Sequence, residues 1–90
     1  MNQWYFEIRI APDNTVGVFF VKKTFWLEHG HMDNNPVFNE IEPLLPDNLK
    51  DNLDEIEESI FASQLSESET REALLSAGFE EQSGLLGNEE

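Results

Sequence analysis

Residues 4–25 read WYFEIRIAPDNTVGVFFVKKTF, and this stretch decides the fold because it holds two strand-forming runs with a turn between them. From Trp4 to Ile10 the apolar residues occupy every second position, which is the period of a strand with one buried face. The second run, Val16 to Phe25, is rich in β-branched and aromatic residues. Between the runs, Pro12 presets one turn dihedral, and Asp13 or Asn14 tolerates the tight part of a turn. The stretch therefore predicts an N-terminal antiparallel β-hairpin.

One register of this hairpin produces a coherent apolar face, and it starts from Ile10 paired with Val16. Because two strands alone are marginal in water, downstream elements must cover that face, and some apolar surface remains on the other. The pairs that follow from this register are Ile8 with Val18, Phe6 with Phe20 and Trp4 with Lys22 on one face, and Tyr5 with Val21 and Glu7 with Phe19 on the other.

Residues 47–61, DNLKDNLDEIEESIF, predict a helix with one apolar and one acidic face. Leu49, Leu53, Ile56 and Ile60 recur at helical steps, so at about 100° per residue they fall within one stripe. Acidic side chains occupy the opposite side. We expect the stripe to pack on the apolar face of the hairpin and the carboxylates to face outward.

A further helix has sequence signals at both ends. Ser66 and Glu69 form a capping box, in which each side chain accepts a hydrogen bond from the backbone of the other residue. Gly78 can take the left-handed dihedrals that follow a helix, with Phe79 folding back towards Leu74 in a Schellman closure. We therefore expect a helix between Ser66 and Gly78.

The middle of the chain carries weaker signals. Residues 28–35 read as a loop because of their glycine and asparagine content. Asn35 and Pro36 suit the cap and first position of a short helix that ends or kinks at Pro43. A short third strand over Val37 to Ile41 is the alternative.

These elements predict a small single α+β domain over residues 1–79. Its N-terminal antiparallel hairpin, with a short third strand as an option, packs against two or three C-terminal helices. Ninety residues are enough for one modest core. Beyond Phe79 the composition turns polar, and residues 80–90 predict a flexible acidic tail in which Leu85 and Leu86 either form a small docking patch or stay unburied.

Charge is distributed unevenly along the chain, whose formal net charge is −14. Residues 1–24 hold three basic and two acidic side chains, a net charge of +1, whereas residues 25–90 hold two basic and seventeen acidic side chains, a net charge of −15. Such a field repels phosphate backbones and anionic membranes, which disfavours direct binding to nucleic acid or lipid. The complementary partner is a basic protein surface.

The chain has no cysteine, so it has neither a disulfide framework nor a thiolate metal site. Residues 1–10 lack the basic start and long apolar run of a signal peptide or membrane span. We expect a soluble, cytoplasmic protein.

Four potential metal ligands lie close together in the sequence: Glu28, His29, His31 and Asp33. Structural zinc sites usually use two separated ligand pairs, so a polar loop is the favoured interpretation, and we predict no cofactor. The chain also lacks a glycine-rich phosphate loop, a GxSxG motif and a cysteine nucleophile. We predict a protein without catalytic activity, and the alternative from a different class is a small metal-dependent enzyme that uses His29 and His31.

The predicted partner-binding residues lie within residues 47–61, and they are Asp47, Asp51, Asp54, Glu55 and Glu58. On a helix, side chains at i and i+4 lie about 6 Å apart along the axis, close to the phosphate spacing of a nucleic-acid strand. In size and charge alone, the chain resembles small acidic DNA-mimic inhibitors such as phage anti-restriction and anti-CRISPR proteins.

We therefore predict a non-catalytic module that inhibits or regulates a basic partner, with nucleic-acid-binding proteins as one class of partner. The alternative within the binding class is a scaffold or homodimer subunit that associates through the hairpin.

Overall fold

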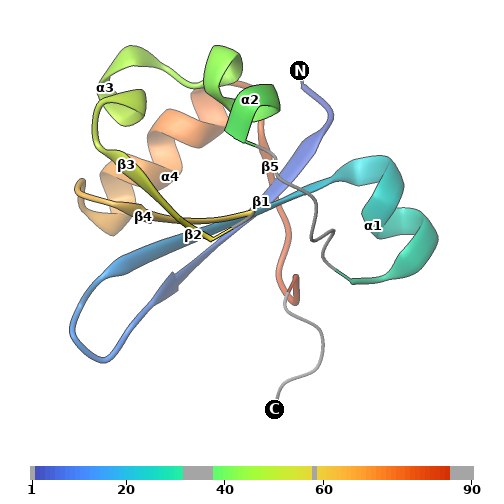
Figure 1. The fold of residues 1–90 in the computed structure, drawn as a ribbon, viewed down its shortest axis with the longest axis horizontal. Helices are drawn as coiled ribbons and strands as arrows, with labels where there is room; N and C mark the ends of the chain where they lie inside the picture. The colour runs from blue at the N-terminus through green and yellow to red at the C-terminus, as the bar shows by residue number, and fades with distance from the viewer. Residues whose placement is uncertain (1, 32–37, 58, 86–90) are drawn as a thin grey trace.

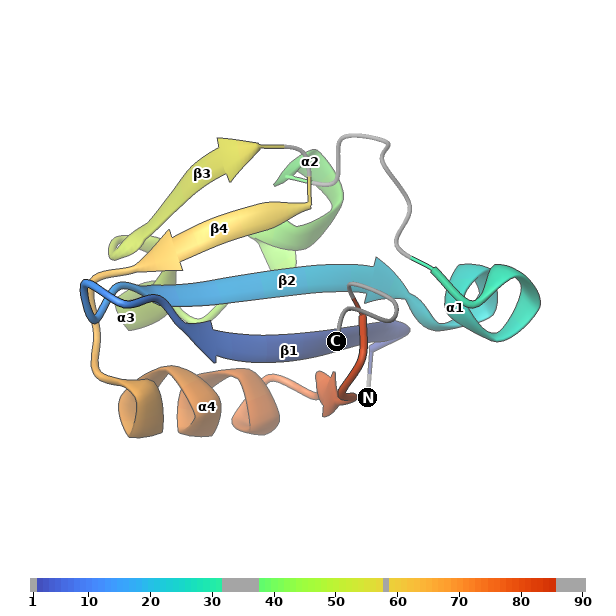
Figure 2. The same cartoon turned by 90° about the horizontal axis from the view of Figure 1, so that it is seen from below.

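A five-stranded mixed sheet forms the centre of the protein. The computed structural model describes residues 2–31, 38–57 and 59–85. The strands lie in the order β3-β4-β2-β1-β5, with β1 and β2 in the middle (Figure 2). Their bounds are β1 (Trp4–Ile10), β2 (Val16–Lys22), β3 (Leu53–Glu57), β4 (Ile60–Ser63) and β5 (Glu80–Glu81).

The predicted hairpin and its register are confirmed. Strands β1 and β2 pair antiparallel from Ile10 with Val16 to Trp4 with Lys22. In the turn, the Asn14 N–H donates to the Ala11 carbonyl (2.8 Å) and Asn14 takes a left-handed φ of 71°. The Asp13 carboxylate accepts the Thr15 N–H (3.0 Å), which closes the turn from the other side. Local sequence chemistry thus fixes the pairing of the two central strands.

Helical segments cover one face of the sheet, as the α+β prediction requires (Figure 1). They are α2 (Phe38–Ile41), the 3₁₀ turn η1 (Glu42–Leu44), α3 (Asp47–Lys50) and α4 (Glu67–Ser76). Between sheet and helices lies one hydrophobic core, formed by Trp4, Phe6, Val18, Phe20, Ile41, Leu45, Leu49, Leu53, Phe61, Ala73, Leu74 and Phe79.

Helix α4 begins and ends where the sequence predicts. Ser66 Oγ accepts the Glu69 N–H (3.2 Å) and Glu69 Oε1 accepts the Ser66 N–H (3.3 Å), which completes the capping box. At the other end, Gly78 has a φ of 95° and the Phe79 N–H donates to the Leu74 carbonyl (3.1 Å). This Schellman closure turns the buried Phe79 back into the core.

The prediction of a single helix over residues 47–61 is wrong. The helix is limited to one turn, Asp47–Lys50, and a second antiparallel hairpin, β3–β4, follows it. Ser59 turns the chain between these strands with a left-handed φ of 69°, and its carbonyl accepts the Phe20 N–H (3.1 Å). The predicted apolar stripe is therefore split, with Leu49 and Leu53 buried and Ile56 58% exposed.

The physical reason combines local and distant effects. A helix over this segment places several carboxylates near its C-terminal half, where the helix dipole disfavours negative charge. In addition, β2 offers an open edge to which β4 adds, with Val18 paired to Phe61. Alternate burial along β4 matches a strand, since Phe61 and Ser63 are buried and Ile60 and Ala62 are half-buried.

The strand expected from Val16 to Phe25 is shorter than predicted. Strand β2 stops at Lys22, and helix α1 (Lys23–His29) replaces both the end of that strand and the start of the loop predicted over residues 28–35. Gly30 ends α1 with a φ of 73°, and its N–H donates to the Trp26 carbonyl (2.8 Å). The glycine read as a loop signal is thus the residue that closes a helix.

The short helix predicted after the loop is confirmed over the part that the structure describes. Phe38–Ile41 is helical, so the alternative of a third strand over Val37 to Ile41 is wrong for these residues. Pro43 lies inside η1, where the α-helix gives way to a tighter 3₁₀ turn. The predicted cap, Asn35 and Pro36, lies outside the described residues.

Residues beyond Phe79 also contribute to the packed structure. Strand β5 pairs parallel to β1, with Tyr5 opposite Glu80, and the Gln82 N–H donates to the Phe6 carbonyl (2.8 Å). Leu85 is fully buried. The packed part of the chain therefore continues past the predicted boundary at residue 79 as far as Leu85, whereas Leu86 lies outside the described residues.

Candidate acidic interface

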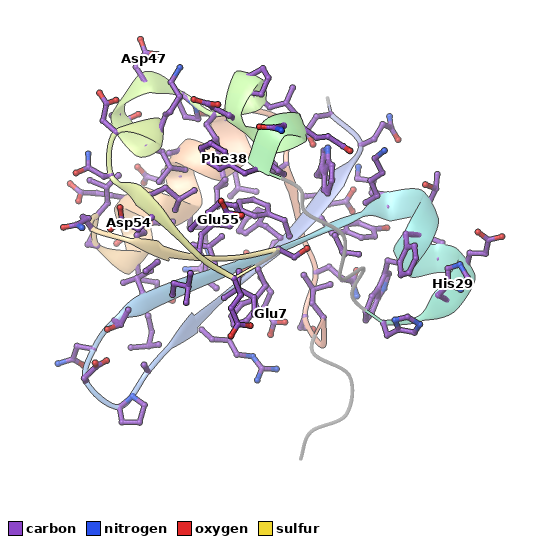
Figure 3. The ribbon with its side chains drawn as sticks, viewed as in Figure 1. Glu7, His29, Phe38, Asp47, Asp54 and Glu55 are labelled. Carbon is purple, nitrogen blue, oxygen red and sulfur yellow. The ribbon has the colours of Figure 1, made fainter. Side chains whose placement is uncertain are left out.

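The predicted partner-binding residues do not form one row on a helix. Asp47 begins α3, Asp51 follows it, and Asp54 and Glu55 lie on β3; all four are exposed. Figure 3 shows Asp47 at the outer end of α3, and Asp54 and Glu55 on β3. Glu58 lies outside the described residues. The structure thus places the four along α3, the turn after it and β3, at one edge of the sheet.

Strand geometry sends the β3 carboxylates to both sides of the sheet. Glu55 pairs with Phe61 and shares its face, while Asp54 pairs with Ala62 on the opposite face. A bulge between Glu55 and Glu57 interrupts the register, and Glu57 pairs with Ile60.

Sequence reasoning missed Glu57, which is exposed on β3. At helical spacing it falls beside the apolar stripe, so the helical interpretation did not include it in the acidic face. A strand interpretation, in which every exposed carboxylate of the edge strand counts, would have found it. We call Asp47, Asp51, Asp54, Glu55 and Glu57 the acidic edge.

Several carboxylates away from the acidic edge have cationic partners. Arg71 binds Glu67 and Glu81, both at 3.1 Å, and these hydrogen bonds, those to Glu81 first, raise the pKa of the Arg71 guanidinium. Ion pairs also join Arg9 to Glu7 (3.1 Å), Lys22 to Glu40 of α2 (3.2 Å) and Lys23 to Glu80 (2.9 Å).

The acidic edge has no such compensation. Within residues 2–31, 38–57 and 59–85, none of its five carboxylates forms an ion pair, and Lys50, the cation nearest in sequence, forms none either. A polar contact within the described residues joins Gln64 Nε2 to Asp54 Oδ2 (2.9 Å). Negative charge is therefore concentrated at the β3 end of the sheet and is largely neutralised at the β5 end.

His29 and His31 pack around an aromatic ring. Their own ring centroids are 5.7 Å apart, and the Phe25 centroid lies 4.3 Å from that of His29 and 5.4 Å from that of His31. Glu28 Oε1 lies 3.7 Å from His29 Nε2. No group of three or more possible metal ligands occurs among the residues that were described, and Asp33 is not one of these.

The back face of the hairpin is partly covered by the C-terminal segment. Glu7 points away from α2, α3 and α4 (Figure 3), and its Oε1 accepts the Leu85 N–H (2.9 Å). Val21 on this face is fully buried, whereas Phe19 stays half-buried. The apolar surface that the sequence predicts for association is therefore reduced by the chain itself.

Two hollows in the described part of the surface lie near helix α4. One, of about 340 Å³, lies between α3 and α4 and is lined by Pro46, Asn48, Glu69, Glu72, Ala73 and Ser76. The other, of about 410 Å³, lies beside the β1–β2 turn and includes Ser63 and Ser66. Neither lining contains a histidine, lysine or arginine, so neither pairs a serine with a nitrogen base.

Comparisons with known proteins add no relative. No protein-family model matches the chain, and no match is found among curated proteins or solved structures. In the described part of the chain, no helix has the length and apolar character needed to cross a membrane.

Proposed function

We propose that this protein acts without catalysis by binding a basic surface of another protein through the acidic edge, and that this binding inhibits or regulates the partner. The observation that carries the proposal is the contrast in ion pairing. Carboxylates at the β5 end have cationic partners within the chain, whereas those of the acidic edge have none among the described residues.

Clustered carboxylates without cations favour a basic partner for a physical reason. Their mutual repulsion and their field are relieved when lysine or arginine side chains approach, and the same field raises the rate of encounter with a basic surface. Charges on an edge strand also prevent unwanted strand pairing. That protective role does not account for Asp47 and Asp51, which lie outside β3.

Nucleic-acid-binding proteins are one class of such partners, since their binding grooves are basic. Mimicry of a phosphate strand rests here on α3 and β3 together, because the single helix that would have spaced the carboxylates in one row is not formed. Competition between this protein and duplex DNA or RNA for the captured partner tests whether the partner is bound at its nucleic-acid site. A captured protein that is released by duplex DNA or RNA is bound at its nucleic-acid site.

The test compares two double variants with the same change in charge. Asp54→Lys with Glu57→Lys alters the acidic edge, and Glu28→Lys with Glu72→Lys alters two exposed carboxylates elsewhere. Each changes the formal net charge from −14 to −10. Each is used, beside the wild type, in a pull-down from native lysate at low salt, with captured proteins identified by mass spectrometry.

We expect the acidic-edge variant to lose the captured partner, by about tenfold or more, while the control variant retains it. Capture by the wild type should also fall steeply as salt rises, because exposed charges are screened. Equal capture by both variants, with circular dichroism unchanged, would contradict the proposal.

A further inference from the structure

Strand β3 has one free side. It lies at the end of the strand order, paired with β4 on one side and with no described strand on the other. Figure 2 shows it as the outermost strand. An edge strand of this kind presents backbone N–H and C=O groups that another strand can bind.

The register shows which backbone groups are presented. The Gln64 N–H donates to the Asn52 carbonyl (2.7 Å), so these two residues form a hydrogen-bonded pair just before the ladder. Pairs alternate along an antiparallel ladder. Asp54 with Ala62 is therefore again a hydrogen-bonded pair, and the residues between, Leu53 and Glu55, direct their N–H and C=O groups to the free side.

The side chains along this edge select the charge of an incoming strand. Asp54 and Glu57 lie on one face and Glu55 on the other, so a strand added here meets carboxylates on both of its faces. Ile56, which is 58% exposed, adds apolar area at the bulge. Lysine and arginine suit such positions, because their stems cover apolar surface while their charged groups reach the carboxylates.

The same charges disfavour the most available alternative occupant, a second copy of this chain. Pairing two β3 strands edge to edge would bring two sets of carboxylates together without intervening cations, which is destabilising. The opposite edge is less suited to strand addition, since β5 has only two residues and both of its glutamates are already ion-paired.

We infer that β3 binds an extended, lysine- or arginine-rich segment of a partner protein as an additional strand of the sheet. This inference rests on the proposed function, and it adds the form in which the partner is recognised. Backbone bonds to Leu53 and Glu55 hold the segment, and the β3 carboxylates select its charge.

The test uses a capped seven-residue peptide of alternating lysine and threonine. A second peptide has the same sequence but carries N-methyl groups on all internal backbone amides, which remove the donors needed for strand pairing and leave the charge unchanged. Binding of each to ¹⁵N-labelled wild-type protein is followed by NMR, together with hydrogen exchange of the protein amides.

We expect the unmethylated peptide to bind and to slow the exchange of the Leu53 and Glu55 amide protons. Methylation should weaken binding by about tenfold or more, since it removes the backbone hydrogen bonds that pair the two strands. Equal binding of the two peptides, or shifts confined to other residues, would overturn the inference.

A matched pair of protein variants tests the same point from the other side. Glu55→Gln and Glu55→Pro remove the same charge, but only proline removes the N–H that faces the free side, a substitution that an edge strand accepts. Proline should weaken binding of the unmethylated peptide by a further factor of about five relative to glutamine, because it removes one backbone hydrogen bond. If the proline variant does not fold, the methylated peptide decides the question on the wild type.

The outcomes separate this inference from the proposed function. If both peptides bind equally and neither binds the Asp54→Lys, Glu57→Lys variant, strand addition is refuted and the acidic edge remains the binding surface. If neither peptide binds the wild type, the inference is refuted, while the lysate experiment still decides the proposed function.

Discussion

Both edge strands of the sheet carry glutamates, but the electrostatic surroundings of these glutamates differ. Glu80 and Glu81 form β5, and each has a cation beside it, from Lys23 (2.9 Å) and Arg71 (3.1 Å) respectively. Glu55 and Glu57 on β3 have none among the described residues. Whether a carboxylate on an edge strand stabilises the fold or stays available to a partner therefore depends on where the chain's cations lie. Composition alone does not show this.

The β5 edge is held by more than its ion pairs. Leu85 is fully buried beyond the strand, and its N–H donates to Glu7 Oε1 (2.9 Å), on the opposite side of the sheet from α2, α3 and α4. Figure 1 shows the segment that follows β5, drawn in red, on that side. Along β3, Leu53 is buried in the core on the other face of the sheet, whereas Ile56 is 58% exposed.

The largest expected effect comes from truncating the buried Leu85 side chain. Leu85→Ala should lower the free energy of unfolding by about 2–3 kcal/mol, because it leaves a cavity in place of a fully buried side chain. Leu75→Ala is the matched control, since Leu75 is 48% exposed, and it should change the free energy by less than about 0.5 kcal/mol. Urea denaturation measures both. Similar values for the two variants would show that Leu85 does not anchor the β5 edge.

Removing the glutamates of the two edges should change the free energy of unfolding by smaller amounts and in different directions. Glu80→Gln with Glu81→Gln removes two paired charges and should lower the free energy of unfolding by about 0.5–1.5 kcal/mol. Glu55→Gln with Glu57→Gln removes two charges that lack cationic partners, and it should leave that free energy unchanged or raise it by about 0.3 kcal/mol. Both double variants change the net charge equally, so their difference reports the surroundings of the carboxylates.

Salt provides the control for this comparison. At about 1 M NaCl the Debye length falls to about 3 Å, and the difference between the two double variants should shrink. A difference that persists at high salt would come from packing or strand propensity instead, and an equal loss of stability at both edges at low salt would contradict the electrostatic contrast.

The sequence predicts those parts of the fold that depend on neighbouring residues. The register of β1 and β2 follows from alternation and one turn, and both ends of α4 follow from Ser66, Glu69 and Gly78. The second hairpin was missed because residues 47–61 carry a helical spacing of apolar residues, and only the open edge of β2 favours a strand there. Tertiary pairing thus overrides the local pattern.

The candidate site is predictable to the same limited degree. That residues 47–57 carry exposed carboxylates follows from composition, and the Glu67–Arg71 pair follows from its spacing of four residues. The pairs of Lys23 with Glu80 and of Lys22 with Glu40 join segments distant in sequence, so the sequence cannot show which acids they neutralise. The imbalance between the edges appears only once the chain is folded.

Asp13 provides a third kind of carboxylate, stabilised by a turn and belonging to neither edge, and its effect should be the smallest. Hydrogen bonds from the Thr15 side chain and backbone hold the pKa of the Asp13 carboxyl below its usual value. A lowered pKa in the folded state means that the stabilisation is complete above the unfolded pKa, about 3.9, and is lost as pH falls through the folded value. The side chain introduced by Asp13→Asn does not titrate. As the solution is acidified from pH 5 to pH 3, the wild type should therefore lose stability relative to the variant.

Urea denaturation at several pH values measures this difference, and an NMR titration of the Asp13 carboxyl should show a midpoint below the usual value. A difference independent of pH would mean that the turn depends on the shape of the side chain and not on its charge, which would leave the β5 glutamates as the better example of carboxylates with a structural role.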